Sequence, residues 1–150
     1  MTRARPLTRS LAALLLLLTP LAGCASQQEK YCDAVKEHQK SLTEIMADAG
    51  PTDLLQALDD FRALRAEAPS DISDEWQQVI RSIEGLQQAL DDAGVDPGDF
   101  DGGKPPAGLS KDDRQAIARA ADEVGSRNTE VALAGVQQQA LDVCKTQLWL

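Results

Sequence analysis

Apolar residues recur at helical spacing in several stretches of the chain, and each stretch is bounded by residues that cap or break helices. In the first stretch the spacing alternates between three and four residues, which places the side chains on one helical face. This face consists of Tyr31, Val35, His38, Leu42, Ile45 and Ala49. Gly50-Pro51 ends the predicted helix, because Gly favours a left-handed cap and Pro cannot continue a helix.

Two further helices are predicted from the same helical spacing of apolar residues. The second begins near Thr52, a suitable N-cap with Asp53 in the first turn, and ends at Pro69. Its apolar stripe is Leu54, Leu58, Phe61, Leu64 and Ala68. The third begins at Ser73 and ends at Gly94, and its stripe is the most regular in the chain. That stripe is Ile72, Trp76, Val79, Ile83, Leu86, Leu90 and Ala93.

Residues 95–109 are rich in Gly and Pro and show no periodicity, so they are predicted to form a loop. Asp96, Asp99 and Asp101 lie within it, and three carboxylates on a Gly-rich segment are a weak candidate for a calcium site. Their spacing departs from the EF-hand pattern, with Pro97 in place of the first acid. A solvated loop is therefore the favoured interpretation.

Two helices complete the predicted fold. A shorter one begins at Ser110, where Asp113 can reach back to the cap, and Gly125-Ser126 breaks or kinks it. The last runs over about residues 127–147. Its predicted inward side chains are Leu133, Val136, Ala140, Leu141, Val143, Cys144 and Leu148. No stretch alternates with a period of two, so the predicted fold class is all-α, a small bundle of four to five helices.

The first 23 residues differ from the rest of the chain. A basic segment with Arg3, Arg5 and Arg9 precedes an unbroken apolar run over residues 11–18. Thr19-Pro20 interrupts this run before it reaches the roughly 20 residues that a membrane-spanning helix needs. The pattern predicts a secretory signal peptide that is removed.

The apolar run ends in Leu21-Ala22-Gly23-Cys24. At this position the motif resembles the lipobox of bacterial lipoproteins. The resemblance implies cleavage before Cys24, a lipid on Cys24, and a protein anchored to the outer face of the cytoplasmic membrane. Residues 24–30 would then be a lipidated polar tether and residues 31–150 the folded domain. An ordinary secretory signal, with Cys24 as an incidental thiol, is the alternative.

Three cysteines in an exported chain leave one without a partner. A lipidated Cys24 resolves this, because Cys32 and Cys144 can then pair in an oxidising compartment. The bridge would close a loop of roughly 110 residues and stabilise the domain by about 4–5 kcal/mol. Two free buried thiols or an intermolecular bridge are the alternatives. From residue 31 onward the chain also loosely resembles small helical lipoproteins of high-GC Gram-positive bacteria, whose function is unknown.

The predicted bridge restricts the topology, because it makes the first and last helices adjacent and antiparallel. Five equal helices in simple up-and-down order would place their ends at opposite poles. Either the last two helices form one bent element, or the loop over residues 95–109 carries the chain back along the bundle.

Charge changes the picture when the chain is divided at Cys24. The whole sequence of 150 residues has a formal charge of −9, with 15 basic and 24 acidic side chains. Three of the basic residues and none of the acidic ones precede Cys24. Residues 24–150 therefore carry 12 basic and 24 acidic side chains, a formal charge of −12. This balance argues against nucleic-acid binding, which needs a basic surface.

Few residues carry candidate chemistry. His38 is the only histidine, and we expect it at the core margin beside a backbone or carboxylate partner rather than as a proton carrier in a cleft. The acidic pairs are expected on polar faces or helix ends, namely Asp59-Asp60, Asp91-Asp92 and Asp112-Asp113. Trp76 is expected in the core, and Trp149 is expected to pack over a helix end.

No catalytic residue, metal site or cofactor is predicted. A lone histidine and no Gly-x-Ser-x-Gly turn give little support to nucleophilic catalysis. We therefore expect a non-catalytic interaction or envelope-associated module, bound to the membrane through lipid on Cys24 and open to an envelope protein partner. A lipoprotein that captures a small ligand or a cation is the alternative.

Overall fold

The computed structural model describes residues 22–150 except residues 48–49, 51 and 101–103, with side chains from residue 27 onward. Within these residues the chain forms five α-helices and no strand, which confirms the all-α prediction. The helices are α1 (Ala22–Ala47), α2 (Leu58–Glu67), α3 (Ser73–Ala93), α4 (Lys111–Val124) and α5 (Arg127–Cys144). Three 3-10 helices are η1 (Asp53–Ala57), η2 (Ser70–Ile72) and η3 (Pro97–Asp99).

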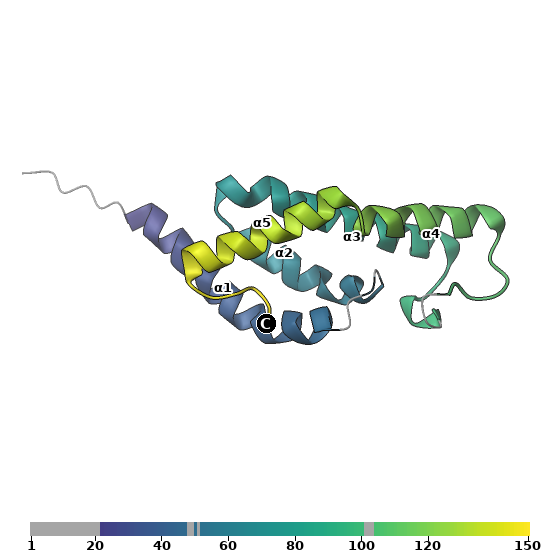
Figure 1. Ribbon diagram of the computed structural model, residues 1–150, viewed down its shortest axis with the longest axis horizontal. Helices are drawn as coiled ribbons and strands as arrows, with labels where there is room; N and C mark the ends of the chain where they lie inside the picture. Colours follow the sequence, from purple (N-terminus) through teal and green to yellow (C-terminus); the bar gives the residue numbers. More distant parts are fainter. Residues whose placement is uncertain (1–21, 48–49, 51, 101–103) are drawn as a thin grey trace, which may run out of the picture.

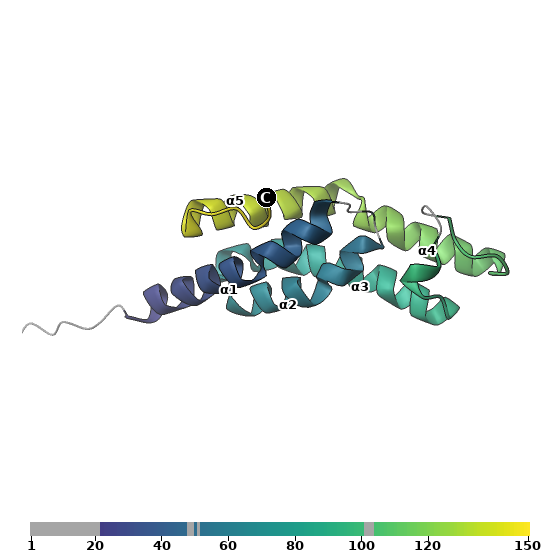
Figure 2. The same ribbon diagram turned by 90° about the horizontal axis from the view of Figure 1, so that it is seen from below.

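The helices form an elongated up-and-down bundle of four rods (Figure 1). The helices α4 and α5 run end to end as one bent rod along α3 and antiparallel to it, as Figures 1 and 2 both show. The fourth rod therefore ends where α1 begins. Of the two predicted topologies, the bent element is correct, and the loop before α4 does not return along the bundle.

A small set of hydrogen bonds fixes the bend between α4 and α5. Ser126 caps α5 by accepting from the Thr129 N–H at 3.3 Å. The Thr129 side chain is fully buried and donates to the Glu123 carbonyl at 2.9 Å, which joins the end of α4 to the start of α5. The predicted break at Gly125-Ser126 is therefore present as a capped bend.

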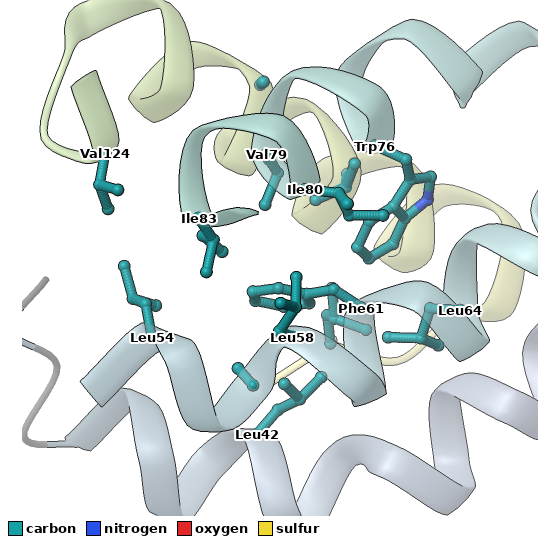
Figure 3. Close-up of a cluster of buried hydrophobic side chains, with 14 of the residues drawn as sticks. Leu42, Leu54, Leu58, Phe61, Leu64, Trp76, Val79, Ile80, Ile83 and Val124 are labelled. Atoms are coloured by element: carbon teal, nitrogen blue, oxygen red, sulfur yellow. The ribbon is translucent and has the colours of Figure 1, made fainter. Parts of the chain in front are cut away.

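The apolar stripes meet in one continuous core. Phe61 of α2 and Trp76 of α3 lie at its centre, both fully buried with ring centroids 5.8 Å apart (Figure 3). The same core includes buried aliphatic side chains from every helix. The predicted role of Trp76 as a core residue is confirmed.

Most predicted helix boundaries agree with the structure. The third predicted helix matches α3 at both ends, and Gly94 closes it in the left-handed conformation with φ +65°. Ser110 caps α4, as predicted, by accepting from the Asp113 N–H at 3.1 Å. The predicted cap at Thr52 is wrong, because the Thr52 side chain makes no capping hydrogen bond. The helical segment that follows Thr52 begins with the 3-10 helix η1 rather than with an α-helix.

The segment over residues 24–30, predicted as a lipidated tether, is helical. Residues 22–47 form one α-helix, so these polar residues are the first turns of α1. A helix rises about 1.5 Å per residue, which is less than half the length of an extended chain. The segment therefore holds the bundle closer to Cys24 than an extended tether would.

The inward face of α5 consists of smaller residues than predicted. Thr129, Ala132, Val136 and Ala140 are buried, whereas Leu141, predicted to face inward, is 41 % exposed. A Cβ added to Gly135 would lie 3.2 Å from Cγ of Glu75, so α5 passes close to α3. Small side chains permit this close approach.

After α5 the chain turns back along the bundle. We call residues 145–150 the C-terminal strap. Lys145 adopts the left-handed conformation with φ 57°, which reverses the chain direction. Leu148 is fully buried, and its N–H donates to Oε1 of Gln137 at 2.9 Å. The Leu150 N–H donates to Oγ1 of Thr43 at 3.0 Å, so the strap connects α5 with α1 (Figure 1).

Candidate functional site

The predicted bridge between Cys32 and Cys144 is present. Their Cα atoms lie 5.1 Å apart, and the bridge joins the N-terminal half of α1 to the last residue of α5. The disulfide therefore closes the bundle at one end. With both cysteines used, Cys24 is the remaining cysteine of the sequence.

Cys24 lies in the first turn of α1. It shares one helical face with positions 27 and 28, which follow it by three and four residues. The signal peptide predicted for residues 1–23 lies almost entirely outside the described residues, as does the Cys24 side chain. Signal peptide and lipid anchor therefore stay predictions. In the described part of the chain, no helix combines the length and apolar character needed to cross a membrane.

His38 lies at the edge of the core, where α1 packs on α2. Its Nδ1 is 2.8 Å from Oδ1 of Asp60, and both side chains are about four-fifths buried, with 23 % and 19 % exposed. This is the carboxylate partner expected for a histidine at a core margin. No hydroxyl or thiol of the described residues is hydrogen-bonded to His38.

The candidate cation loop is not assembled as a metal site. Asp96 accepts from the Gly98 N–H at 2.8 Å, and Asp99 accepts from the Asp96 N–H at 3.3 Å, so both carboxylates cap η3. Asp101 lies outside the described residues. No group of three or more metal-ligating side chains occurs among the residues that the structure describes.

The other residues singled out from the sequence have structural roles. Asp59 forms an ion pair with Arg62 at 3.1 Å, and Asp92 accepts from Gln88 at 2.7 Å. Trp149 is half-buried against the core, which confirms its predicted packing. Asp59, Asp92 and Trp149 have no buried polar atom without a hydrogen-bond partner.

A cavity that the sequence did not indicate lies near the disulfide end of the bundle. It has a volume of about 310 Å³, and we call it the Gln139 cleft. Its lining includes Gln27 and Gln28 of α1, Ser70 and Asp71 of η2, and Gln139 and Val143 of α5. Gln27 donates to the Ala68 carbonyl at 3.3 Å, which holds α1 against the turn after α2.

The Gln139 carboxamide is buried without a hydrogen-bond partner at either its nitrogen or its oxygen. A buried polar group without a partner costs about 1–3 kcal/mol, and native proteins contain few of them. The cost is largest where both halves of an amide are unsatisfied. This side chain is therefore the least compensated polar group on α5 within the described structure.

Two more buried polar atoms lack partners at this end of the bundle, the Tyr31 hydroxyl and the Trp76 indole nitrogen. Burial raises the pKa of Tyr31 to about 12, the neighbouring Trp76 indole lowers it, and the charge of Asp71 raises it further. The indole is thus near the hydroxyl without meeting hydrogen-bond geometry. Asp71, whose charge acts on Tyr31, also lines the Gln139 cleft.

Two larger hollows lie elsewhere on the molecule, of about 500 and 460 Å³. Asp53 and Gln56 line both of them. Neither hollow is lined by a buried polar atom without a partner, among the side chains described. The Gln139 cleft is therefore the stronger candidate site, although it is smaller.

The chain was compared with protein-family models, with curated proteins and with solved structures, and no comparison gave a match. The class that the fold and the bridge define is a disulfide-closed, all-α bundle.

Proposed function

We propose that this chain is an exported lipoprotein, anchored by lipid on Cys24 to the outer face of the cytoplasmic membrane, and that its bundle is a non-catalytic interaction module. The observation that carries the proposal is Cys24 itself. It ends a lipobox-like motif after a basic and an apolar segment, and it is the cysteine left over by the Cys32–Cys144 bridge. Disulfides persist in oxidising compartments, which supports export.

The helical start of α1 gives the anchor a defined geometry. Cys32 follows Cys24 by eight positions, which corresponds to a rise of about 12 Å along a helix. A lipidated Cys24 would therefore hold the closed end of the bundle next to the bilayer. The α3–α4 end, at the far end of the long axis in Figure 2, would then project away from the membrane.

A non-catalytic role is supported by the surroundings of the only histidine. A histidine base normally contacts a nucleophile through one ring nitrogen and an orienting carboxylate through the other. His38 has the carboxylate, Asp60, and no hydroxyl or thiol bonded to it among the described residues. The pair connects α1 with α2, which is a structural role.

Labelling with a fatty-acid analogue in the producing bacterium tests the anchor. The wild-type chain should incorporate the label and Cys24→Ala should not, because the thioether forms on the Cys24 sulfur. Ser26→Ala, in the same turn of α1, is the matched control and should label like the wild type. Equal labelling of wild type and Cys24→Ala would reject the anchor.

Site-specific crosslinking in intact cells tests the interaction role. A photoreactive residue at Val131, which is 60 % exposed on α5, should give one discrete crosslinked product. The same residue at buried Val136 is the control and should give none. A survey of exposed positions on α4 and α5 that yields no discrete product would contradict an interaction module. Loss of the product in Cys24→Ala would tie the interaction to the membrane.

A small-ligand carrier is the second candidate function. The observation that favours it is the Gln139 cleft, a hollow of about 310 Å³ lined by residues of α1, η2 and α5. Ligand sites in proteins are concave and of at least about this volume.

A further inference from the structure

The C-terminal strap is held on α1 by two polar side chains that bind its main chain. Gln39 donates to the Gln147 carbonyl at 2.6 Å. Thr43 accepts from the Leu150 N–H at 3.0 Å. These two residues of α1 are four positions apart, so the strap follows the helix for about one turn (Figure 1).

On α5 the strap is held by one carboxamide. Oε1 of Gln137 accepts from the Leu148 N–H at 2.9 Å, and its nitrogen donates to the Trp149 carbonyl at 3.3 Å. Residues 147–150 therefore each have one main-chain group bound by a side chain of α1 or α5. The same four residues make no backbone–backbone hydrogen bond with the part of the chain that the structure describes. We call Gln39, Thr43 and Gln137 the strap site.

The side chains of the strap add one enclosed anchor. Leu148 is fully buried in the core and Trp149 is half-buried against it, whereas Leu150 is 80 % exposed. Proteins that bind extended peptides use the same division, in which the main chain of the peptide supplies hydrogen bonds and alternate side chains fill pockets. The strap site therefore has the properties of a peptide site that is occupied by the chain's own strap.

A single residue, Lys145, is the hinge between α5 and the strap. Its φ of 57° lies in the left-handed region, which disfavours a residue with a side chain by about tenfold. The Lys145 N–H donates to the Leu141 carbonyl at 3.1 Å, and its Nζ donates to the Asp142 carbonyl at 2.6 Å. If the strap swings out, Lys145 can return to a favoured conformation, but Leu148 loses its place in the core.

A second copy of the chain is the occupant that restores these contacts. Its strap has the same sequence, so it can form the same hydrogen bonds with the strap site as the strap of the first copy does. The strap contacts therefore cancel between a closed and an exchanged form, and the hinge conformation and the cost of association decide the balance. Short hinges under strain favour such exchange.

We propose that two copies of this protein exchange their C-terminal straps, so that the strap of each copy occupies the strap site of the other. The dimer is symmetric, because each copy gives one strap and receives one. A lipid on Cys24 would hold the copies in one membrane plane with the ends of α5 at the same height, which raises their effective concentration. That last step rests on the proposed anchor, whereas the exchange itself does not.

The test uses the full chain in detergent micelles, with the photoreactive residue p-benzoylphenylalanine in place of the exposed Leu150. Unlabelled and ¹⁵N-labelled proteins are mixed equally, unfolded in urea with the disulfide intact, refolded together and irradiated. Mass spectrometry of the digest identifies crosslinks from the strap to the α1 peptide that contains Thr43. Exchange predicts crosslinks of mixed label at this α1 peptide, in a share that rises with protein concentration.

Two results would overturn the proposal. One is that every strap–α1 crosslink joins peptides of the same label at all concentrations up to about 1 mM, the effective concentration typical of short tethers. The other is that mixed-label crosslinks scatter over exposed residues, because exchange reproduces the contacts of the closed form. The experiment does not depend on lipid at Cys24, so failure of the anchor and failure of exchange are separate results.

Two substitutions at the hinge separate backbone strain from side-chain effects. Lys145→Gly removes the penalty of the left-handed conformation in both closed copies, so the association constant for exchange should fall by about tenfold or more. Lys145→Ala is the matched control, because it keeps the Cβ and loses the same Nζ bond to the Asp142 carbonyl. It should exchange at least as much as the wild type. Circular dichroism confirms that both variants are folded, and equal association constants for the two would overturn the proposal.

Discussion

At the residue scale, the most perturbed group is Tyr31, the only tyrosine of the sequence. Burial is the main reason that its pKa rises from 10.0 to about 12. The folded state therefore favours the neutral phenol, and this contribution to stability is complete below pH 10. It is lost as the pH rises from about 10 to about 12, because the unfolded state loses its proton first.

We therefore predict that the free energy of unfolding falls more steeply between pH 10 and pH 12 in the wild type than in Tyr31→Phe. The difference should reach about 2–3 kcal/mol, which corresponds to two units of pKa. Urea unfolding followed by circular dichroism measures it, and absorbance at 295 nm reports the phenolate of this single tyrosine. Parallel curves for the two proteins would contradict the burial argument.

The His38–Asp60 contact is a second residue-scale feature with a measurable energy. The two side chains are mostly buried and 2.8 Å apart, so we expect a coupling free energy of about 1 kcal/mol in a double-mutant cycle to alanine. The control is the cycle for Lys40 and Glu44, an exposed pair 3.8 Å apart on α1. Its coupling should be below about 0.5 kcal/mol. Equal couplings would show that burial adds nothing to the His38 contact.

At the scale of the element, α3 offers one substitution with opposite expected effects at two positions. Gly94 closes the helix with φ +65°, a conformation that costs residues with a side chain about 1–2 kcal/mol. Gly85 lies inside the same helix, and a Cβ there would meet nothing within 4 Å. Gly94→Ala should therefore destabilise the protein, and Gly85→Ala should stabilise it by about 0.5–1 kcal/mol.

Thermal unfolding of the two alanine variants and the wild type measures this difference. The order of midpoints should be Gly85→Ala, wild type, Gly94→Ala. If both substitutions shifted the midpoint in the same direction, the left-handed cap would not be the feature that ends α3.

The helices also show how far the sequence determines the fold. α3 could be predicted at both ends, because its stripe is regular and Ser73 and Gly94 mark its limits. The start of α1 could not, since residues 25–30 carry no apolar stripe, and the tertiary contact there is a polar one, from Gln27 to the Ala68 carbonyl. In α5 the tight packing on α3 selects Ala132 for the interior beside the predicted Ala140, whereas the sequence pattern also placed the larger Leu141 there.

The candidate site was less predictable than the fold. The bridge followed from cysteine count and predicted export, and the His38 partner followed from its position in an apolar stripe. The Gln139 cleft had no such signal. Gln27, Gln28 and Gln139 are far apart in sequence, and glutamines on a helix ordinarily face solvent. Only the meeting of α1, η2 and α5 makes them one site.

At the scale of the whole molecule, the disulfide closes the bundle at one end only. It joins residues 112 positions apart, so in the unfolded state it restricts almost the whole folded part of the chain. Replacing both cysteines, as Cys32→Ala with Cys144→Ala, should lower the free energy of unfolding by about 4–5 kcal/mol. Urea unfolding measures the loss, and a change below about 1 kcal/mol would contradict the role of the bridge.

Because the bridge lies at one end of the bundle, its removal should increase local opening of the native state mainly at that end. The disulfide holds α1 to α5 at one end and the C-terminal strap holds them together farther along α1, at Thr43, whereas α4 packs mainly on α3 at the other end. Hydrogen exchange of the double alanine variant should therefore accelerate first in the N-terminal turns of α1 and the C-terminal turns of α5. The ranking of hydrogen-exchange rates among the amides of α3 and α4 should be the same in the variant as in the wild type. Uniform acceleration along all helices would mean that the bundle opens as a single cooperative unit, and that the bridge stabilises it only through the unfolded state.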